Sequence, residues 1–233
     1  MKLLKKKRYA LIASTSASVM RAVYARTSRE QFKVDLVIVD RSCGAELFAE
    51  EQGVPCFRVP DGLSAEQRSD SICDQLLKAE IDFAYIFFTR LLKGRLLSIY
   101  SNKLVNFHPS LLPACPGLHG FEDSIKSGAL IIGSTVHFVN EGMDTGPQIM
   151  QAACPVNRTC FGPTTQRHII FSQQVACLLQ VHIWLDSDSI AIASDTDHVT
   201  ICETNRTFLN GFIPDLDYQA KSIYDEVVDR ILA

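Results

Sequence analysis

Three polar side chains, Asn106, His108 and Asp144, have the types and spacing of an acyl-transfer site. Asn106 and His108 stand two residues apart at the end of an apolar run, so on a strand they face the same side. An amide can donate to a carbonyl oxygen that becomes an oxyanion, and an imidazole can accept or give a proton near neutral pH. Asp144, in a glycine-rich loop, can orient His108 or relay its proton. On spacing alone, a purely structural histidine remains the alternative.

The surrounding segments predict the elements that position these residues. Apolar or β-branched runs at 9–13, 34–40, 56–59, 83–88 and 104–107 are typical of buried parallel strands. Helical spacing at 16–25, 45–52, 65–79 and 91–100 separates them, and Ser64 with Gln67 predicts a capping box. The alternation predicts an α/β fold with a doubly wound, mostly parallel sheet. Pro109 and Pro113 should stiffen the loop that follows His108.

The pattern changes after residue 130. Residues 130–139 and 148–156 predict two strands close together in sequence, and Pro163 opens a helical stretch to about residue 185. Residues 189–194 and 198–203 predict a small hairpin, and residues 217–232 a terminal helix.

The turn after the first predicted strand is the expected anion site, because ligands of doubly wound sheets bind where strands end. It has the sequence Ser14, Thr15, Ser16, Ala17, Ser18 and no glycine, so a dinucleotide-binding fingerprint is absent. Hydroxyl and backbone N–H groups could hold a phosphate or carboxylate there. The alternative is that these serines cap the following helix.

The composition excludes several function classes. The 233 residues carry a formal net charge of −3, which gives no general attraction to nucleic acid or anionic membranes. The sequence has no run of 18 apolar residues, so it predicts no transmembrane helix. The 8 cysteines form no CxxC pair, so we expect no zinc site and reduced thiols in a cytoplasmic protein. The basic start resembles a secretory signal, but its apolar run is too short.

Several motifs resemble those of a known family. Asn-Phe-His-Pro-Ser-Leu-Leu-Pro at 106–113 resembles the Asn-x-His-Pro-Ser-Leu-Leu-Pro signature of folate-dependent formyltransferases. Pro-Gly-Leu-His at 116–119, Gly-Ser-Thr-Val-His at 133–137 and Asp-Thr-Gly-Pro at 144–147 are similar to phosphoribosylglycinamide (glycinamide ribonucleotide) formyltransferases in particular. Phe-Thr-Arg-Leu-Leu at 88–92 resembles their Phe-Met-Arg-Ile-Leu folate segment. The similarity is dense between about 83 and 156 and thin elsewhere.

The resemblance implies a Rossmann-like formyltransferase domain that takes 10-formyltetrahydrofolate as co-substrate and uses no metal. The formyl group would pass to a primary amine, nominally that of glycinamide ribonucleotide in purine biosynthesis. Direct attack by the amine is implied, with Asn106 and protonated His108 stabilising the oxyanion and Asp144 assisting proton removal. The matched folate positions are Phe88, Thr89, Arg90, Leu91, Leu92, Val139, Asn140, Glu141, Gly142 and Met143. The matched acceptor positions are Ser14, Thr15, Ser16, Ala17, Ser18, Pro109 and Gln174, with His119 and His137 in support.

The departures from the family concern the acceptor. Its first turn reads Gly-Asn-Gly-Ser-Asn, whereas this chain has Thr-Ser-Ala-Ser-Val at 15–19, which makes close backbone approach harder. The family's acceptor-binding Glu matches Gln174. One alternative is therefore a paralogue that N-formylates an amino sugar nucleotide or a hydroxylamine such as hydroxyornithine. Another is a non-catalytic remnant that binds folate or an anion, against which the intact Asn106, His108 and Asp144 argue.

We expect one catalytic domain over residues 1–233. Residues 1–100 would serve the acceptor, 101–185 catalysis and folate, and 186–233 would form the hairpin and terminal helix. The length leaves no room for the extra domains of methionyl-tRNA formyltransferase or formyltetrahydrofolate hydrolase. The expected partner is a small-molecule amine, and the protein a monomer or a homodimer through the apolar stretch at 166–185. Cys115, in the loop after His108, could be an oxidisable neighbour of the site.

Overall fold

The computed structural model describes residues 6–156, 162–193, 198–202 and 222. Their internal contacts define two compact units. Unit 1 comprises the residues up to Asn106 together with Phe138–Gly142, and unit 2 comprises Phe107–His137 and the residues from Met143 onward. The predicted helix at 217–232, apart from position 222, and the predicted hairpin turn at 195–197 lie outside the described residues.

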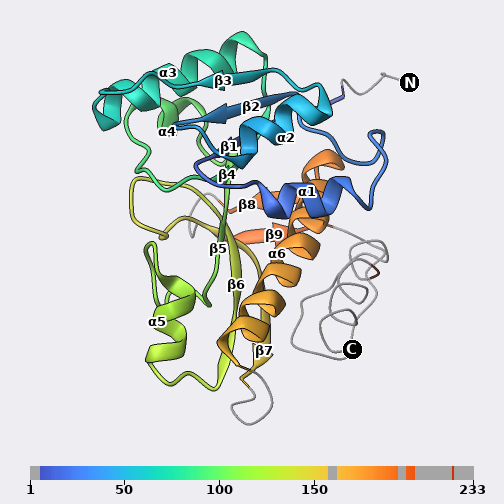
Figure 1. Ribbon diagram of the computed structural model, residues 1–233, viewed down its shortest axis with the longest axis vertical. Coiled ribbons are helices and arrows are strands. Elements are labelled where there is room, and N and C mark those ends of the chain that lie inside the picture. The colour runs from blue at the N-terminus through green and yellow to red at the C-terminus, as the bar shows by residue number, and fades with distance from the viewer. Residues whose placement is uncertain (1–5, 157–161, 194–197, 203–221, 223–233) are drawn as a thin grey trace. The chain divides into compact units, whose positions relative to one another are not determined.

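Unit 1 alternates strands and helices (Figure 1). Its elements are β1 (Tyr9–Ala13), α1 (Ser18–Tyr24), β2 (Leu36–Val39), α2 (Gly44–Gln52), β3 (Cys56–Arg58), α3 (Ala65–Lys78), β4 (Phe83–Phe87), α4 (Arg95–Ile99) and the first part of β5 (Leu104–His108). The pairs β1–β2, β1–β4, β2–β3 and β4–β5 are all parallel.

Unit 2 contains the end of β5 and a second set of elements. These are α5 (Gly120–Lys126), β6 (Ile131–Phe138), β7 (Gln148–Pro155), α6 (Pro163–Asp186), β8 (Ile190–Ile192) and β9 (Val199–Ile201). The pairs β6–β7 and β8–β9 are antiparallel. Hydrogen bonding orders the main sheet as β3-β2-β1-β4-β5-β6-β7, which confirms the predicted mostly parallel α/β class.

The sheet of unit 1 is covered on both faces, as the doubly wound prediction requires. Alternate residues of β1, such as Ala10 and Ile12, join a core with Ile72 of α3 and Leu96 of α4. Residues of the opposite parity face the other helices, because side chains alternate across a strand. There the rings of Tyr9 and Tyr85 stack 5.7 Å apart, and Phe32 and Phe48 each contact Tyr24 of α1 edge to face.

Local signals explain several element boundaries. The predicted capping box is confirmed, since Ser64 Oγ accepts from Gln67 N and the Gln67 side chain accepts from Ser64 N. Helix α2 ends at Gly53, which has the left-handed φ of 63° that glycine tolerates.

Two helix predictions need correction, and one helix was missed. The first helix begins at Ser18 rather than residue 16, because Ala17 has a left-handed φ of 55° and cannot continue a helix. The helix predicted at 91–100 begins only at Arg95, after Gly94 with a φ of 60°. Helix α5 was not predicted, because it is only 7 residues long and follows a proline- and glycine-rich loop.

Helix α6 is the longest element and belongs to the core of unit 2. Its segment Thr164–Asp186 is long and apolar enough to cross a membrane by length and composition. Yet 72% of that apolar stretch is buried within the protein, and a buried core helix gives the same signal. The helix is thus only a weak indication of a membrane span.

Candidate active site

Strand β5 carries two of the predicted catalytic residues. Asn106 is half-buried and His108 is buried, with 4% of its surface exposed. Both lie in the strand itself, which extends one residue beyond the predicted end at 107. Their two-residue spacing places both side chains on the same face of β5, as the sequence predicts.

Both ring nitrogens of His108 face hydrogen-bond acceptors. Nε2 lies 2.8 Å from the carbonyl oxygen of Cys115, and Nδ1 lies 3.3 Å from Oδ2 of Asp144. A carbonyl oxygen only accepts, so Nε2 must carry a proton, and a proton on Nδ1 is needed to donate to the carboxylate. The geometry therefore provides an acceptor for a proton on either ring nitrogen.

Asp144 is the acceptor of three donors in unit 2. Its Oδ2 accepts from the backbone N–H of Gly117 at 2.7 Å, and its Oδ1 lies 3.6 Å from Nε2 of His137. The hydrogen bond from His137, the Gly117 amide and the charges of His108 and His137 together outweigh burial, which acts in the opposite direction. They lower the pKa of Asp144 from 3.8 to about 2, so the carboxylate is ionised at neutral pH.

The loop after His108 is fixed by hydrogen bonds to β6. Thr135 Oγ1 donates to Ser110 O at 2.7 Å and accepts from Leu112 N at 2.9 Å. Ser110 Oγ donates to the carbonyls of Ala114 and Cys115, and the side chain is fully buried. Ser110 thus holds the carbonyl that faces His108, a positioning role that requires no nucleophilic serine. Pro109, a predicted acceptor contact, lies half-buried beside His108 in sequence.

A glycine gives the imidazole its space. A Cβ at Gly120, the first residue of α5, would lie 2.5 Å from Nε2 of His108 and 3.0 Å from Cys115 O. These distances are too short for a side chain, so the packing of α5 against His108 requires glycine at this position. His119, predicted as a supporting residue, is exposed and is the N-terminal flanking residue of α5.

The predicted acceptor turn belongs to unit 1. Ser14 is buried and its Oγ accepts from the backbone N–H of Thr89 at 3.1 Å, while Thr15, Ser16 and Ser18 are exposed. The alternative that the serines cap α1 is wrong, since Ala17 is the N-cap residue and no side chain makes a capping hydrogen bond. The hydroxyls at 15, 16 and 18 are thus exposed at the carboxyl end of β1.

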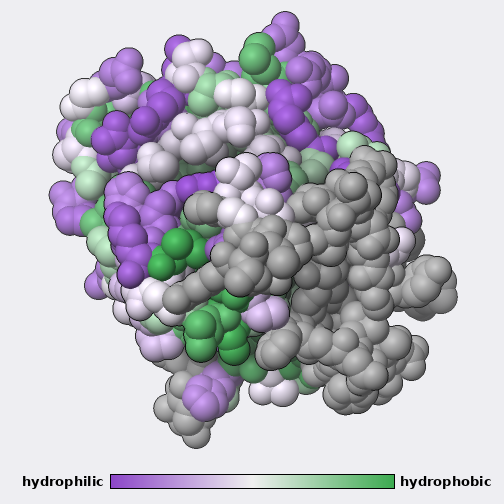
Figure 2. Space-filling view, turned by 60° about the horizontal axis from the view of Figure 1, so that its bottom comes forward, coloured by the Kyte–Doolittle hydropathy of each residue, from purple (hydrophilic) through white to green (hydrophobic). Residues whose placement is uncertain are grey.

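The predicted folate positions of unit 1 form two stretches. In the first, Phe88 and Leu92 pack on the hydrophobic core whereas Thr89, Arg90 and Leu91 are exposed. In the second, Val139 N donates to Leu104 O at 2.8 Å, the Asn140 side chain accepts from Gly142 N at 3.1 Å, and Glu141 is exposed. Met143, assigned to unit 2, is 62% exposed, and its sulfur would lie 3.4 Å from a Cβ at Gly117. Figure 2 shows hydrophobic residues reaching the surface of one face in a few places among hydrophilic ones.

Gln174 on α6 contacts the strand that carries the predicted catalytic residues. Its Nε2 donates to the carbonyl oxygen of Phe107 at 3.2 Å, between Asn106 and His108 of β5. The sequence indicated Gln174 only as a contact of the formyl-accepting substrate. It did not reveal this hydrogen bond or the direct approach of His137 to Asp144. The Gln174 bond joins residues 67 positions apart, and the approach of His137 depends on how the loop after β6 folds back on that strand.

The cysteines of the described residues are free thiols. Burial raises the pKa of Cys177 to about 12 and that of Cys154 to about 11, so both stay protonated at neutral pH. At Cys115 the backbone carbonyl oxygen is the group that faces His108 Nε2. Among the described residues no group of three or more His, Cys, Asp or Glu side chains could hold a metal ion.

Comparison with known proteins decides the family. The formyl transferase family profile matches residues 7–168. The chain belongs to this family. Formyl transfer is therefore its class of reaction, and the resemblance read from the motifs is confirmed.

Individual formyl transferases show how close the match is. The chain is 34% identical over 158 residues to phosphoribosylglycinamide formyltransferase of Bacillus subtilis, covering 65% of this chain and 80% of that protein. It is 36% identical over 153 residues to the Mycobacterium tuberculosis protein of that name, covering 64% and 71%. The solved glycinamide ribonucleotide transformylase 1 from Symbiobacterium toebii matches with a TM-score of 0.79 at 26% identity, covering 85% of this chain and 95% of that one.

Proposed function

We propose that this formyl transferase passes the formyl group of 10-formyltetrahydrofolate to the primary amine of glycinamide ribonucleotide, in the cytoplasm. The observation that supports this best is the contact between buried His108 and half-buried Asp144. His108 ends the strand that also carries Asn106. The two relatives at 34 and 36% identity are both named phosphoribosylglycinamide formyltransferase, which supports this acceptor.

In the proposed reaction the amine attacks the formyl carbon directly. A C–N bond forms, and the carbonyl electron pair moves onto the formyl oxygen. The Asn106 amide and the His108 ring donate hydrogen bonds to this oxyanion, and Asp144 assists removal of the amine proton. The C–N bond to the folate then breaks, the oxygen becomes a carbonyl again, and the folate nitrogen leaves with a proton.

In this proposal the Cys115 carbonyl oxygen accepts the His108 hydrogen bond that the oxyanion later accepts. His108 Nε2–H donates to that carbonyl at 2.8 Å, so the ring is satisfied without a substrate. An oxyanion is a stronger acceptor than a neutral carbonyl because its hydrogen bond is charge-assisted. The incoming charge would therefore draw the Nε2–H away from Cys115.

The remaining roles are carried over from the sequence. We assign the stretches 88–92 and 139–143 to the folate, and the turn 14–18 with Pro109 and Gln174 to the acceptor. Because Ser14 and Gln174 already have backbone partners, their part is to shape the site. The single catalytic domain over 1–233 belongs to this proposal.

One observation favours a different amine as the substrate that accepts the formyl group. The turn that carries glycines in the family has side chains at every position here, and Ala17 keeps a left-handed backbone that suits glycine. An amino sugar nucleotide or a hydroxylamine is therefore the second candidate.

A coupled assay tests both candidates. Purified protein is mixed with 10-formyltetrahydrofolate and a panel of amines, and release of tetrahydrofolate is followed. We expect turnover with glycinamide ribonucleotide that falls to background in His108→Ala and persists in His168→Ala, an exposed histidine of α6. If only another amine supports turnover, that amine replaces glycinamide ribonucleotide as the proposed acceptor. If none of the amines gives turnover above the His108→Ala background, the proposal that the protein is a formyltransferase enzyme is rejected.

A further inference from the structure

A network of polar side chains joins three strand ends in unit 1. Ser14 follows β1, Asp40 follows β2, and Thr89 with Arg90 follows β4. In the order β3-β2-β1-β4-β5, strands β2 and β3 lie on one side of β1, and β4 and β5 lie on its other side. The direction in which the chain adds strands therefore reverses between β1 and β4. Such a reversal is where open α/β sheets bind ligands, at the carboxyl ends of the strands. The network therefore stands at the expected ligand position of this unit.

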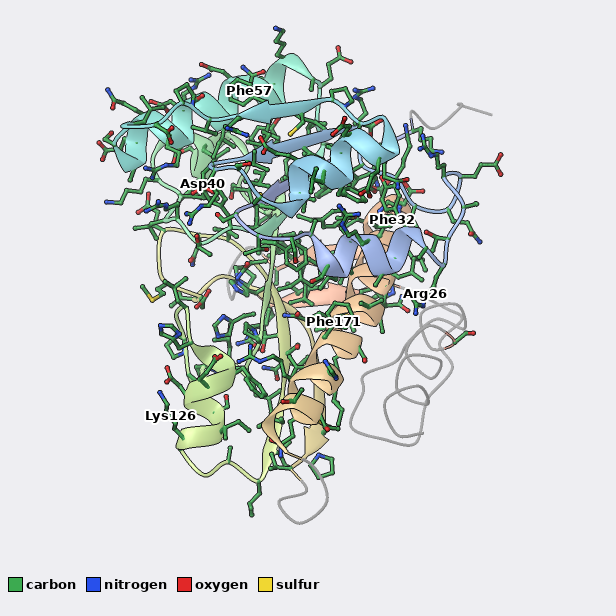
Figure 3. All side chains as sticks on the ribbon, viewed as in Figure 1. Arg26, Phe32, Asp40, Phe57, Lys126 and Phe171 are labelled. Carbon is green, nitrogen blue, oxygen red and sulfur yellow. The ribbon has the colours of Figure 1, made fainter. Side chains whose placement is uncertain are left out.

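Asp40 is the centre of the network. Its side chain is 4% exposed and accepts from Arg41 Nε at 3.1 Å, Arg41 Nη2 at 2.8 Å and Arg90 Nε at 3.1 Å. Burial by itself would raise the pKa of Asp40, but hydrogen bonds from Arg41, Ser14 and Arg90 lower it to about 2. Figure 3 labels this residue at the end of β2. A buried carboxylate that is ionised at neutral pH thus positions two guanidinium groups.

The network carries an excess of positive charge. Two guanidinium groups share one carboxylate, and the side chains of Arg41 and Arg90 are 44% and 52% exposed. Elsewhere in the unit Arg58, equally exposed, forms a two-bond pair with a single partner, Glu46. The Asp40 network can therefore receive an anion, whereas the Arg58 pair is already neutral.

Arg41 lies on the short loop between β2 and α2, and the start of α2 packs against the acceptor turn. There a Cβ at Gly44 would lie 2.8 Å from Cα of Ser16, and Ala45 N donates to Thr15 O at 3.1 Å. Arg41 Nη2 also donates to Thr89 Oγ1 at 3.3 Å. Backbone and side-chain contacts thus hold this guanidinium beside the turn that lacks the glycines of the family.

We infer that Arg41 binds the phosphate monoester of the acceptor, and that Asp40 is the positioning residue that aims its guanidinium. A guanidinium suits this task because its charge is permanent. Asp40 and Thr89 accept from Nε and Nη2 of Arg41, and the Nη1 N–H groups can donate to phosphate oxygens. Side-chain recognition would then replace the backbone contacts that glycines allow in relatives. This inference rests on the proposed function.

The test measures effects on the formyl acceptor and on the formyl donor separately. KM for glycinamide ribonucleotide and for 10-formyltetrahydrofolate is measured in the wild type, Arg41→Gln, Asp40→Asn and the control Arg58→Gln. Loss of a charge-assisted phosphate contact should raise the acceptor KM of Arg41→Gln about 10- to 100-fold. The folate KM should stay within about twofold, and Asp40→Asn should show a smaller rise in acceptor KM without a matching loss of kcat. Arg58→Gln should match the wild type.

Calorimetric titration with inorganic phosphate gives a readout without turnover. We expect binding to the wild type that weakens about tenfold or more in Arg41→Gln and not in Arg58→Gln. Equal phosphate binding by the wild type and Arg41→Gln would overturn the inference, as would a rise in the folate KM alone. Absence of turnover by the wild type with glycinamide ribonucleotide would instead reject the proposed function, while the titration still decides the phosphate site.

Discussion

Replacement of Asp144 by Asn tests the carboxylate at the centre of the site. The substitution keeps the shape of the side chain but removes the charge that faces His108 at 3.3 Å and His137 at 3.6 Å. An amide offers one oxygen, so it cannot accept from the Gly117 N–H and from both imidazoles. We therefore expect loss of both stability and turnover.

The expected loss of stability follows from the pKa. A fall from 3.8 to about 2 in the folded protein corresponds to roughly 2 kcal/mol at neutral pH. Because the folded pKa is depressed, this contribution is present above pH 4 and is lost as pH falls towards 2. Urea unfolding should therefore show Asp144→Asn to be about 2 kcal/mol less stable at pH 7, with a gap that narrows below pH 4.

The expected loss of turnover follows from proton transfer. An acid–base group is typically worth ~10²–10⁴-fold, so kcat should fall at least ~10²-fold in the tetrahydrofolate-release assay. The control is Asp123→Asn, an exposed carboxylate of α5 that lies 4.0 Å from Lys126. It should keep wild-type turnover and stability. Wild-type turnover in Asp144→Asn, or a stability gap that does not change with pH, would refute the reasoning.

Three glycine-related substitutions test the local packing. Gly120→Ala should lower turnover about tenfold or more while unfolding stays cooperative, because the new Cβ would displace His108 from its partners; unchanged kcat would contradict this. Ala17→Gly should raise the free energy of unfolding by about 0.5–1 kcal/mol, seen as a higher urea midpoint, since it relieves a left-handed φ of 55°; a lower midpoint would show that the turn is unstrained. Gly133→Ala should cost about 3 kcal/mol or more, because its Cβ would meet Ala152 O; a wild-type melting curve would contradict the packing of β6 on β7.

The fold class was predictable from local patterns. Buried parallel strands are short apolar runs, and the helices between them have their own spacing, so the alternation up to β5 follows from residue types. The errors fall where backbone conformation overrides spacing. Ala17 delays α1, and Gly94 delays α4 to Arg95 although Leu91 and Leu92 have helical character.

The relative placement of the candidate catalytic residues on β5 was predictable because their spacing and motif are local. Asn106 and His108 share a strand, and strand periodicity alone puts them on one face. Asp144 was indicated by its motif, while its partners were not. The contact with His137 and the bond from the Gly117 amide join residues that lie 7 and 27 positions away.

The sequence by itself determined the α/β class, the formyl transferase motifs and the three catalytic candidates. Only the tertiary structure decided that Asp40 holds Arg41 and Arg90 together and that Gln174 donates to the Phe107 carbonyl. The physical reason is that periodicity describes each element separately. Which side chains meet is set by strand order and packing, which bring distant residues within the roughly 3 Å of a hydrogen bond.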